Sequence, residues 1–400
     1  MDQHGCISNS LSILRIMTMF GIVAVHALQL PIYTHYSGGI DISKSYLLAE
    51  SILTPADNQP WFIDKLVYLY AHCGWSLNYT FFLISGMSLW YSTRISGRFN
   101  LKDYLFSRFW GIYVPYAVAV VIIFCIGITY LNIKSSTYDL VGLLLGAAAS
   151  SEYLKCYDSP LWFISLLMIF YLFFPIFPSI YKKFRLSGLL VSLAIIYAVS
   201  RWLDGFPLIA RLWVGYYFLF FAAGVVVMEL ILSGTAHLSD RRIMNAVKVI
   251  LVASVPISAY ILYWSIYDQN ISRLGSSFME PRYFVAICSA LIALSIGFLL
   301  PDKYEVFNNL LRKAGRATFA VYIYHFVFIQ LYNTYRWKLT FIAEPLYAHV
   351  SLALFIVYIL LVAAATLYQY AMDAFLLRLR KLVDKTIDLQ PARKIESSSI

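Results

Sequence analysis

Charged side chains are scarce in this 400-residue chain. Asp, Glu, Lys and Arg make up 13% of the sequence, whereas hydrophobic residues make up 60%. A water-soluble fold of this length would have too few polar side chains to cover its surface. The composition therefore excludes a soluble globular protein and predicts a chain that lies in a lipid bilayer.

Metal-binding patterns, internal repeats and linkers are also lacking. The five cysteines have no spacing typical of a metal site, so we expect no metal. No segment repeats with a fixed period, and no low-complexity linker divides the chain. We therefore expect one membrane domain over residues 1–372, followed by a basic cytoplasmic tail over residues 373–400 that is partly disordered.

Long apolar runs, in contrast, are abundant, and short polar connections separate them. Because a helix needs roughly 20 apolar residues to cross a bilayer, these runs predict an all-α fold, a polytopic bundle of about ten transmembrane helices. The expected helices cover residues 11–32, 73–92, 105–130, 161–181, 186–203, 211–233, 244–266, 282–300, 317–333 and 346–372. Two shorter runs, residues 61–72 and 138–150, are expected to be interfacial or re-entrant pieces.

Basic residues are distributed unequally across this bundle. Ten spans put both termini on one side, and that side holds 21 of the 31 Lys and Arg residues, against 10 on the other side. The richer side is expected to be cytoplasmic, with the protein in the inner (plasma) membrane. The net charge of +10 is then explained by this bias and by contact with anionic lipids, and it requires no nucleic-acid partner.

Three ionisable side chains within the apolar runs are candidates for function, namely Arg15, His26 and His325. Burying such a group in a bilayer costs several kcal/mol by most scales, roughly 3 or more, so each needs an explanation. Arg15 and His26 lie eleven residues apart, which places them on one helix face and about 16 Å apart along its axis. A ligand with an anionic end and a distant reactive end, such as an acyl-coenzyme A, would suit this spacing.

The residue types fit the same chemistry. Arginine binds phosphate oxygens through forked hydrogen bonds, and histidine can act near neutral pH as a general base or as an acyl acceptor. A snorkelling Arg15 and a His26 bonded to a neighbouring helix would explain the spacing equally well.

His325 is expected at a depth similar to that of His26, because it follows Arg316 by nine residues in a helix that runs in the same direction. The two imidazoles could therefore face one cavity. Tyr322, three residues before His325, lies on the same helix face. A structural histidine remains the alternative for His325.

Five segments occur in a recognisable order. Arg15 and His26 form the pattern Arg-x10-His, residues 75–86 end in Phe-Phe-x-x-Ser-Gly, and residues 104–115 end in Ile-Tyr-x-Pro. Residues 160–175 and 315–325 supply two further matches. Together the segments resemble the acyltransferase 3 family of membrane-bound O-acyltransferases, over residues 11 to about 372.

The resemblance implies transfer of an acyl group, most often acetyl, from cytoplasmic acyl-coenzyme A to a hydroxyl of a cell-surface or lipid-linked polysaccharide. Acetyl-coenzyme A would be the donor substrate and the glycan the acceptor. His26 is then the general base or acyl relay, and Arg15 and Arg108 are ligands of the donor phosphates. His325 and Tyr322 would act beside His26 or on the acceptor side.

The sequence departs from the family pattern near Arg108. Family members often carry a second arginine three residues later, where this chain has Gly111. Arg94 or Arg98 could replace it as a donor ligand. Ser85 is a candidate hydroxyl in the cavity, although a Ser-Gly step between helices is more often a packing contact.

Tryptophan is unevenly placed in the expected topology. Seven of the nine tryptophans are expected toward the outer face. An interfacial aromatic belt would explain them, although such a belt normally populates both interfaces. A surface on which sugars stack is the alternative.

Two further classes of function stay open. An exporter of a glycan or small anion also uses buried histidine and arginine, although no inverted repeat is visible in the sequence. A non-catalytic scaffold for polysaccharide assembly is the third class, and the presence of both Arg15 and His26 argues against it.

Overall fold

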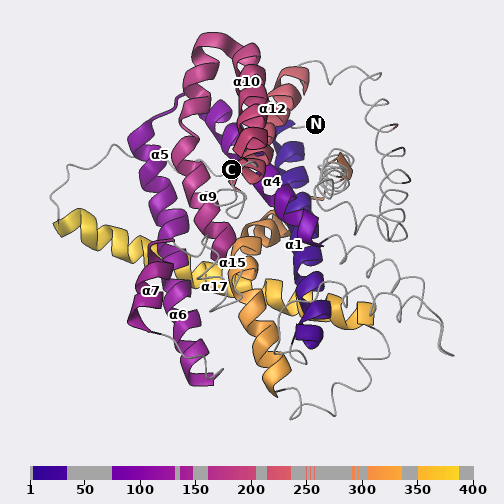
Figure 1. Cartoon of the computed structure of the whole chain (residues 1–400), viewed down its shortest axis with the longest axis vertical. Helices are drawn as coiled ribbons and strands as arrows, with labels where there is room; N and C mark the ends of the chain where they lie inside the picture. Colours follow the sequence, from indigo (N-terminus) through magenta and orange to yellow (C-terminus); the bar gives the residue numbers. More distant parts are fainter. Residues whose placement is uncertain are drawn as a thin grey trace.

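The computed structural model describes residues 3–33, 74–130, 136–146, 161–203, 214–235, 304–335 and 350–386, together with a few isolated positions. Within these ranges the secondary structure is helical (Figure 1), which confirms the all-α prediction for the described chain. The elements are α1 (Gln3–Tyr33), α4 (Gly74–Ser96), α5 (Leu101–Arg108), η1 (Phe109–Tyr113), α6 (Val114–Tyr130), α7 (Thr137–Leu144), α9 (Leu161–Phe173), α10 (Ile176–Leu203), α12 (Val214–Thr235), α15 (Glu305–Tyr335) and α17 (Val350–Thr386).

Eight of the ten expected helices correspond to these elements, with shifted ends. The expected helices over 244–266 and 282–300 lie almost entirely outside the described residues, as does the short run 61–72. The run 138–150 overlaps the short helix α7, which begins at Thr137 and ends at Leu144. Helix α17 continues to Thr386, so the first part of the expected tail is helical.

Five of the described helical stretches are long and apolar enough to cross a membrane, by length and composition. They are Gly5–His26, Leu101–Thr129, Ile176–Trp202, Tyr217–Gly234 and Phe355–Leu379. The expected number of about ten spans stays a prediction for the chain as a whole.

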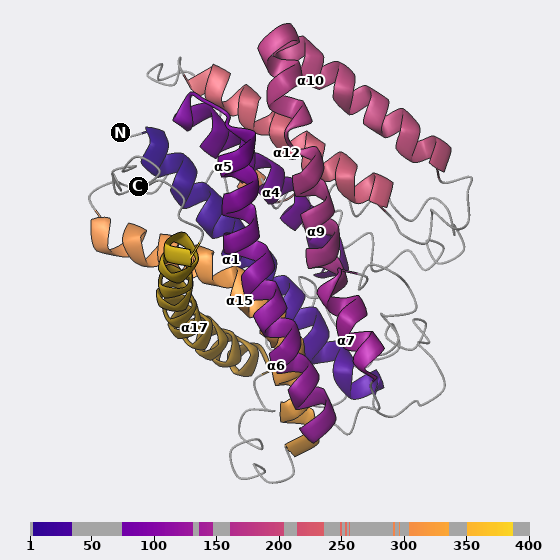
Figure 2. The same cartoon turned by 90° about the vertical axis from the view of Figure 1, so that its left-hand side faces the viewer.

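The bend in α10 separates two expected spans. Pro175 follows α9, and α10 then turns at Arg185, whose φ of 54° is non-helical. Figure 2 shows the second limb of α10 running back from this bend. The expected interruption between residues 181 and 186 is therefore present as a bend within one element.

The helices pack in a row. Helix α12 lies between α10 and α4, α4 also contacts α1, and α1 contacts α15, which in turn contacts α17. At the α4–α12 contact a Cβ on Gly86 would overlap the backbone of Phe221, and one on Gly224 would overlap the backbone of Leu83. The two glycines therefore let the helix backbones meet, as small residues do between membrane helices.

The α1–α15 contact has the same cause. A Cβ on Gly315 would lie 2.8 Å from the Cβ of Ser12, closer than real side chains allow. Glycine at this position therefore brings the helix of Arg15 and His26 against the helix of His325.

Helix α17 crosses the neighbouring helices at a steep angle, and Figure 2 shows it almost end-on. The Tyr358 hydroxyl donates a hydrogen bond of 2.8 Å to the carbonyl of Ile16, which ties α17 to α1. Gln369 lies about three helical turns further along α17 and lines the cavity described below.

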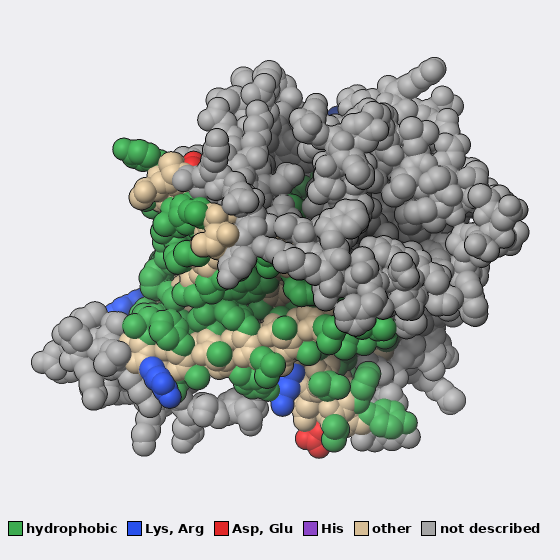
Figure 3. All heavy atoms as spheres, turned by 90° about the horizontal axis from the view of Figure 1, so that it is seen from below, with side chains coloured by type: hydrophobic (Ala, Val, Ile, Leu, Met, Phe, Trp, Pro, Cys, Tyr) green, Lys and Arg blue, Asp and Glu red, His purple; other side chains and the backbone are tan. Residues whose placement is uncertain are grey.

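Outward faces of several helices are apolar. Val191 and Ile195 on α10, and Leu360 and Leu367 on α17, are each at least 57% exposed. Figure 3 shows hydrophobic side chains over most of the coloured part of one face. Such surfaces are unfavourable in water and suit contact with lipid.

Candidate functional site

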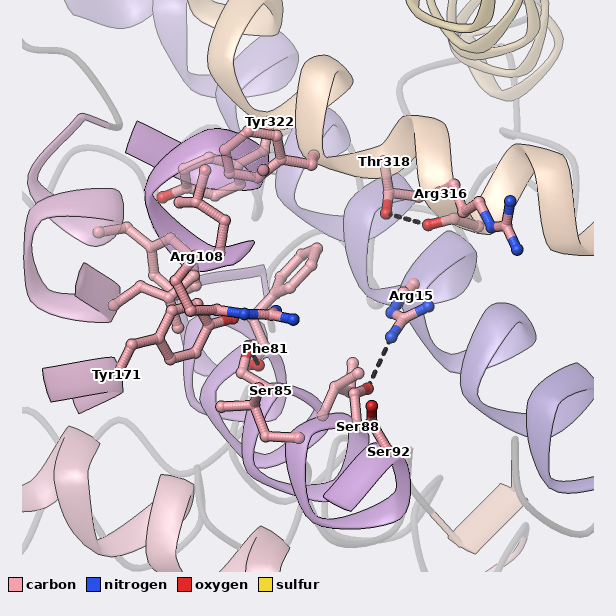
Figure 4. A pocket seen from close by; sticks show the side chains of 18 of the residues that line it. Arg15, Phe81, Ser85, Ser88, Ser92, Arg108, Tyr171, Arg316, Thr318 and Tyr322 are labelled. Carbon is pink, nitrogen blue, oxygen red and sulfur yellow. Dashed lines mark hydrogen bonds between the residues drawn. The ribbon is translucent and has the colours of Figure 1, made fainter. Parts of the chain in front are cut away.

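A cavity of about 270 Å³ lies between α1, α4, η1, α9 and α15. Helix α1 contributes Arg15, whose guanidinium Nη2 donates a 2.6 Å hydrogen bond to the hydroxyl of Ser88 on α4. Ser85 and Ser92 line the cavity from the same face of α4, because they are spaced around Ser88 by three and four residues. One wall therefore presents a cation and three hydroxyls (Figure 4).

Arg108 enters the cavity from the opposite side (Figure 4). It is the last residue of α5, and its Cζ lies 5.7 Å from the ring centre of Tyr104 and 5.9 Å from that of Tyr171. The Tyr104 hydroxyl donates a 2.9 Å hydrogen bond to the carbonyl of Tyr171. The two rings thus hold the Arg108 side chain by cation–π contact.

The π-helix η1 follows Arg108 directly. Pro115 has no N–H, and in an α-helix its ring would clash with the carbonyl four residues earlier. The wider turn avoids this clash, and the N–H of Val114 instead donates to the carbonyl of Phe109, five residues back. The altered phase brings Gly111 and Ile112 to the cavity wall. A Cβ added to Gly111 would meet no atom within 4 Å.

Arg316 on α15 is a third arginine in the lining, and it is exposed at the rim. The sequence placed Arg316 near the cytoplasmic face but did not identify it as a ligand residue. The available signal was its position next to Gly315, the residue through which α15 meets α1.

Charge is unbalanced in this cavity. Its lining contains Arg15, Arg108 and Arg316 and, among the described residues, no Asp or Glu. Like charges held near one another without a carboxylate favour a bound anion, and forked guanidinium groups suit phosphate. The cavity can therefore hold a ligand that carries more than one negative charge.

Neither arginine proposed as a replacement at Gly111 reaches the cavity. Arg94 instead forms a salt bridge of 3.0 Å between its Nε and Oε2 of the buried Glu229. Arg98 is exposed and absent from the lining, because α4 ends at Ser96 and Gly97, with φ of 66°, turns the chain away. Among the arginines discussed, Arg316 therefore lines this cavity and Arg98 does not.

The two histidines meet. The ring centres of His26 and His325 lie 5.2 Å apart, and the Phe326 ring packs against His26 in a T-shaped arrangement with ring centres 5.7 Å apart. His325 is fully buried, at 0% exposure, while His26 is partly buried. The contact between α1 and α15 thus brings together two imidazoles that are about 300 residues apart in sequence.

The hydrogen bonds of His325 fix its tautomer. Its Nδ1 lies 2.7 Å from the carbonyl oxygen of Tyr322 and 3.2 Å from that of Val321. Carbonyl oxygens only accept, so Nδ1 carries the proton and Nε2 has the free lone pair. Nε2 is buried and has no hydrogen-bond partner among the described residues. In the neutral imidazole this nitrogen can accept a proton.

Tyr322 connects the two parts of the site. It lines the cavity, and its ring centre lies 5.7 Å from that of His325. Ser85 also lines the cavity, but its hydroxyl donates to the carbonyl of Phe81 at 2.8 Å, and the adjacent Gly86 packs against α12. Ser85 is thus at a wall of the cavity and beside a packing contact.

Metal-binding side chains do not gather in the described parts of the chain, where no three His, Cys, Asp or Glu residues are placed to hold a metal ion. The geometry instead offers cations for an anionic ligand and imidazoles for proton or acyl transfer.

Comparison with known proteins identifies the family. The family model described as an acyltransferase domain matches residues 8–369, nearly the whole chain. No curated protein and no solved structure matches the chain. The match includes every cavity and histidine residue discussed above, and members of the family are multi-pass membrane proteins. This chain therefore belongs to the acyltransferase 3 family of membrane acyltransferases.

Proposed function

We propose that this acyltransferase transfers an acyl group, in the first place acetyl, from cytoplasmic acyl-coenzyme A to a hydroxyl of a cell-surface or lipid-linked polysaccharide. The main support for an acyl-coenzyme A donor is the cavity, which is lined by Arg15, Arg108 and Arg316 and by no carboxylate among the described residues. Coenzyme A has a diphosphate and a further phosphate, so several negative charges would meet several cations.

The distance from cations to imidazole supports the same donor. His26 follows Arg15 on the same helix by about 16 Å, so a donor anchored by its phosphates can reach the histidines with its thioester. The histidine pair, rather than His26 alone, lies at that depth.

The reaction then needs one base. His26 takes the proton from the acceptor hydroxyl while the oxygen of that hydroxyl attacks the carbonyl carbon of the thioester. The carbon–sulfur bond breaks, and the leaving thiolate takes the proton from the imidazolium, which gives the ester and free coenzyme A. In an acyl-relay version the imidazole nitrogen carries the acyl group before the hydroxyl receives it. His325 and Tyr322 support this step, and neither version calls for a metal.

The proposal of a glycan acceptor rests on the family resemblance and on the tryptophans expected at the outer face. The proposal of the inner membrane rests on the resemblance and on the excess of basic residues at the side of the termini. Anionic lipids at the basic side are proposed as further partners.

Label transfer tests the proposal. Purified protein in liposomes is incubated with acetyl-coenzyme A labelled in the acetyl group and with candidate polysaccharides, and label in the polysaccharide is counted. We expect transfer by the wild type and little by His26→Ala. Movement of an unmodified glycan or anion across the liposome membrane, without label transfer, would support an exporter and overturn the proposal.

A further inference from the structure

Three aromatic rings from three helices meet at one end of the cavity. Phe81 on α4, Phe163 on α9 and Tyr322 on α15 all line it. The ring centres lie 4.7 Å apart for Phe163 and Tyr322, 5.7 Å for Phe81 and Phe163, and 5.8 Å for Phe81 and Tyr322. Their exposures are 8%, 3% and 3%. The three rings are in mutual contact, and we call them the ring layer.

The histidine pair packs against the ring layer at Tyr322. Tyr322 contacts the His325 ring at 5.7 Å, and His325 contacts His26 at 5.2 Å. Neither histidine lines the cavity, whereas all three arginines do. Figure 4 shows Phe81 and Tyr322 around the space that the Arg15 and Arg108 side chains enter. Tyr322 of the ring layer thus lies between the cavity, which the three arginines line, and the imidazoles.

We propose that Phe81, Phe163 and Tyr322 form the acyl passage of the enzyme and restrict its donors to those with a short acyl group. This inference rests on the proposed function. A donor held by the arginines must bring its thioester past Tyr322 to reach the imidazoles, so its acyl group comes to lie against this ring and the two rings packed on it.

Close packing makes this passage selective. Protein interiors leave little space between side chains, so each methylene added to an acyl group that rests against these rings must displace ring atoms. One methylene in a hydrophobic site typically changes relative rates by roughly 10- to 200-fold. An acetyl group, with a single methyl beyond the carbonyl carbon, disturbs the ring layer least. Chains of four or six carbons would require it to open.

The test measures the ratio of the transfer rates with two acyl donors. Vesicles that contain the protein receive acetyl-coenzyme A or hexanoyl-coenzyme A, labelled in the acyl group, with the polysaccharide that accepts label in the experiment above. The wild type is expected to use acetyl at least about 10-fold faster. Phe163→Ala should raise the hexanoyl-to-acetyl ratio by about 10-fold or more, and Phe81→Leu should raise it in the same direction.

Phe170→Ala is the matched control. Phe170 lies two turns after Phe163 on the same helix and is also buried, at 0% exposure, but it does not line the cavity. Its substitution should leave the ratio unchanged. Because both donors are measured on one preparation, the ratio does not depend on how much of a variant is folded.

The outcomes separate the two proposals. If the wild type transfers acyl groups but uses hexanoyl as fast as acetyl, or if Phe163→Ala and Phe81→Leu keep the wild-type ratio, the acyl passage is overturned and the proposed function stands. If the wild type transfers neither group to any acceptor, both proposals fall.

Discussion

Two buried polar regions share helix α4, and they use arginine in opposite ways. In the first, Glu229 accepts hydrogen bonds from Trp90 Nε1 at 2.8 Å, from the Tyr181 hydroxyl at 2.7 Å and from Ser233 at 3.0 Å, in addition to its salt bridge with Arg94. In the second, the cavity is lined by Arg15, Arg108 and Arg316, and its lining contains no Asp or Glu among the described residues.

The difference separates a structural role from a ligand-binding one. The carboxylate of Glu229 has four donors and joins α4, α10 and α12, so its region is complete without a ligand. Arg15 instead donates a hydrogen bond to the neutral hydroxyl of Ser88, and the cavity that it lines contains no Asp or Glu among the described residues. A bound anion would complete the second region, so substitutions there should affect activity, and those in the first should affect stability.

The largest expected effect in the ligand-binding region concerns His26. General-base catalysis is typically worth about 10²- to 10⁴-fold, so His26→Ala should lose at least about 100-fold in turnover while it binds donor almost normally. His26→Asn should fail as well, because an amide keeps hydrogen bonding but cannot take the proton. Single-turnover label transfer measures this loss. A folded His26→Ala that retains more than about a tenth of wild-type turnover would exclude histidine catalysis at this position and point to Nε2 of His325.

The structural region should respond differently. Glu229→Ala leaves the Trp90 N–H and the Tyr181 hydroxyl without their acceptor, and one or two unsatisfied buried donors cost about 2–4 kcal/mol. We expect a lower thermal unfolding temperature in detergent, with a nearly unchanged donor dissociation constant for the folded fraction. Loss of donor affinity at normal stability would show that Glu229 belongs to the ligand site.

Much of this site follows from local helix geometry, which a sequence pattern records. Arg15, His26, Tyr322 and His325 are each placed by the 3.6-residue period within one helix. The prediction that the two imidazoles face one cavity assumed that α1 and α15 run in the same direction. The two rings lie 5.2 Å apart between centres, but neither histidine is part of the cavity lining. Gly315 makes that contact possible.

The remaining features depend on packing or on broken periodicity. The π-helix changes the phase after Arg108, so an extrapolated α-helix misplaces the residues up to Ile112. Arg98 is a residue type that suits a phosphate ligand, but the positive φ of Gly97 turns the chain, and with it Arg98, away from the cavity. The role of Glu229 does not follow from its place in a run of apolar residues, because only the folded chain brings its donors together from three helices.

The affinity for the donor compares most directly an arginine of the cavity, Arg15, with an arginine paired to a carboxylate, Arg94. Arg15→Ala should weaken acetyl-coenzyme A binding by about 1.5–3 kcal/mol, the value of a hydrogen bond to a charged group. Arg15→Lys should restore only part of this, because an ammonium cannot form the forked contact. The matched control is Arg94→Ala, since Arg94 is already neutralised by Glu229. Equal dissociation constants for Arg15→Ala and the wild type would remove Arg15 from the donor site.

The smallest expected effect tests whether Arg316 supplies the charge that Gly111 lacks. Arg316 is exposed at the rim, so water screens its charge, and Arg316→Gln should weaken donor binding by only about 0.5–1.5 kcal/mol, or roughly 2- to 10-fold. Gly111 lines the same cavity and has open space where a Cβ would lie, so Gly111→Arg can bring a guanidinium back into it.

The double variant Arg316→Gln, Gly111→Arg should therefore recover most of the lost affinity, because binding depends on the number of cations around the anion more than on the helix that carries them. Lys313→Gln removes an exposed charge from the same helix outside the cavity lining, and it should change the dissociation constant little. Raising the salt concentration should reduce the difference between wild type and Arg316→Gln, as expected for a screened rim charge. If the double variant folds and binds no better than Arg316→Gln, then the cation of Arg316 acts at a position that Gly111 cannot reach, and the two sites are not interchangeable.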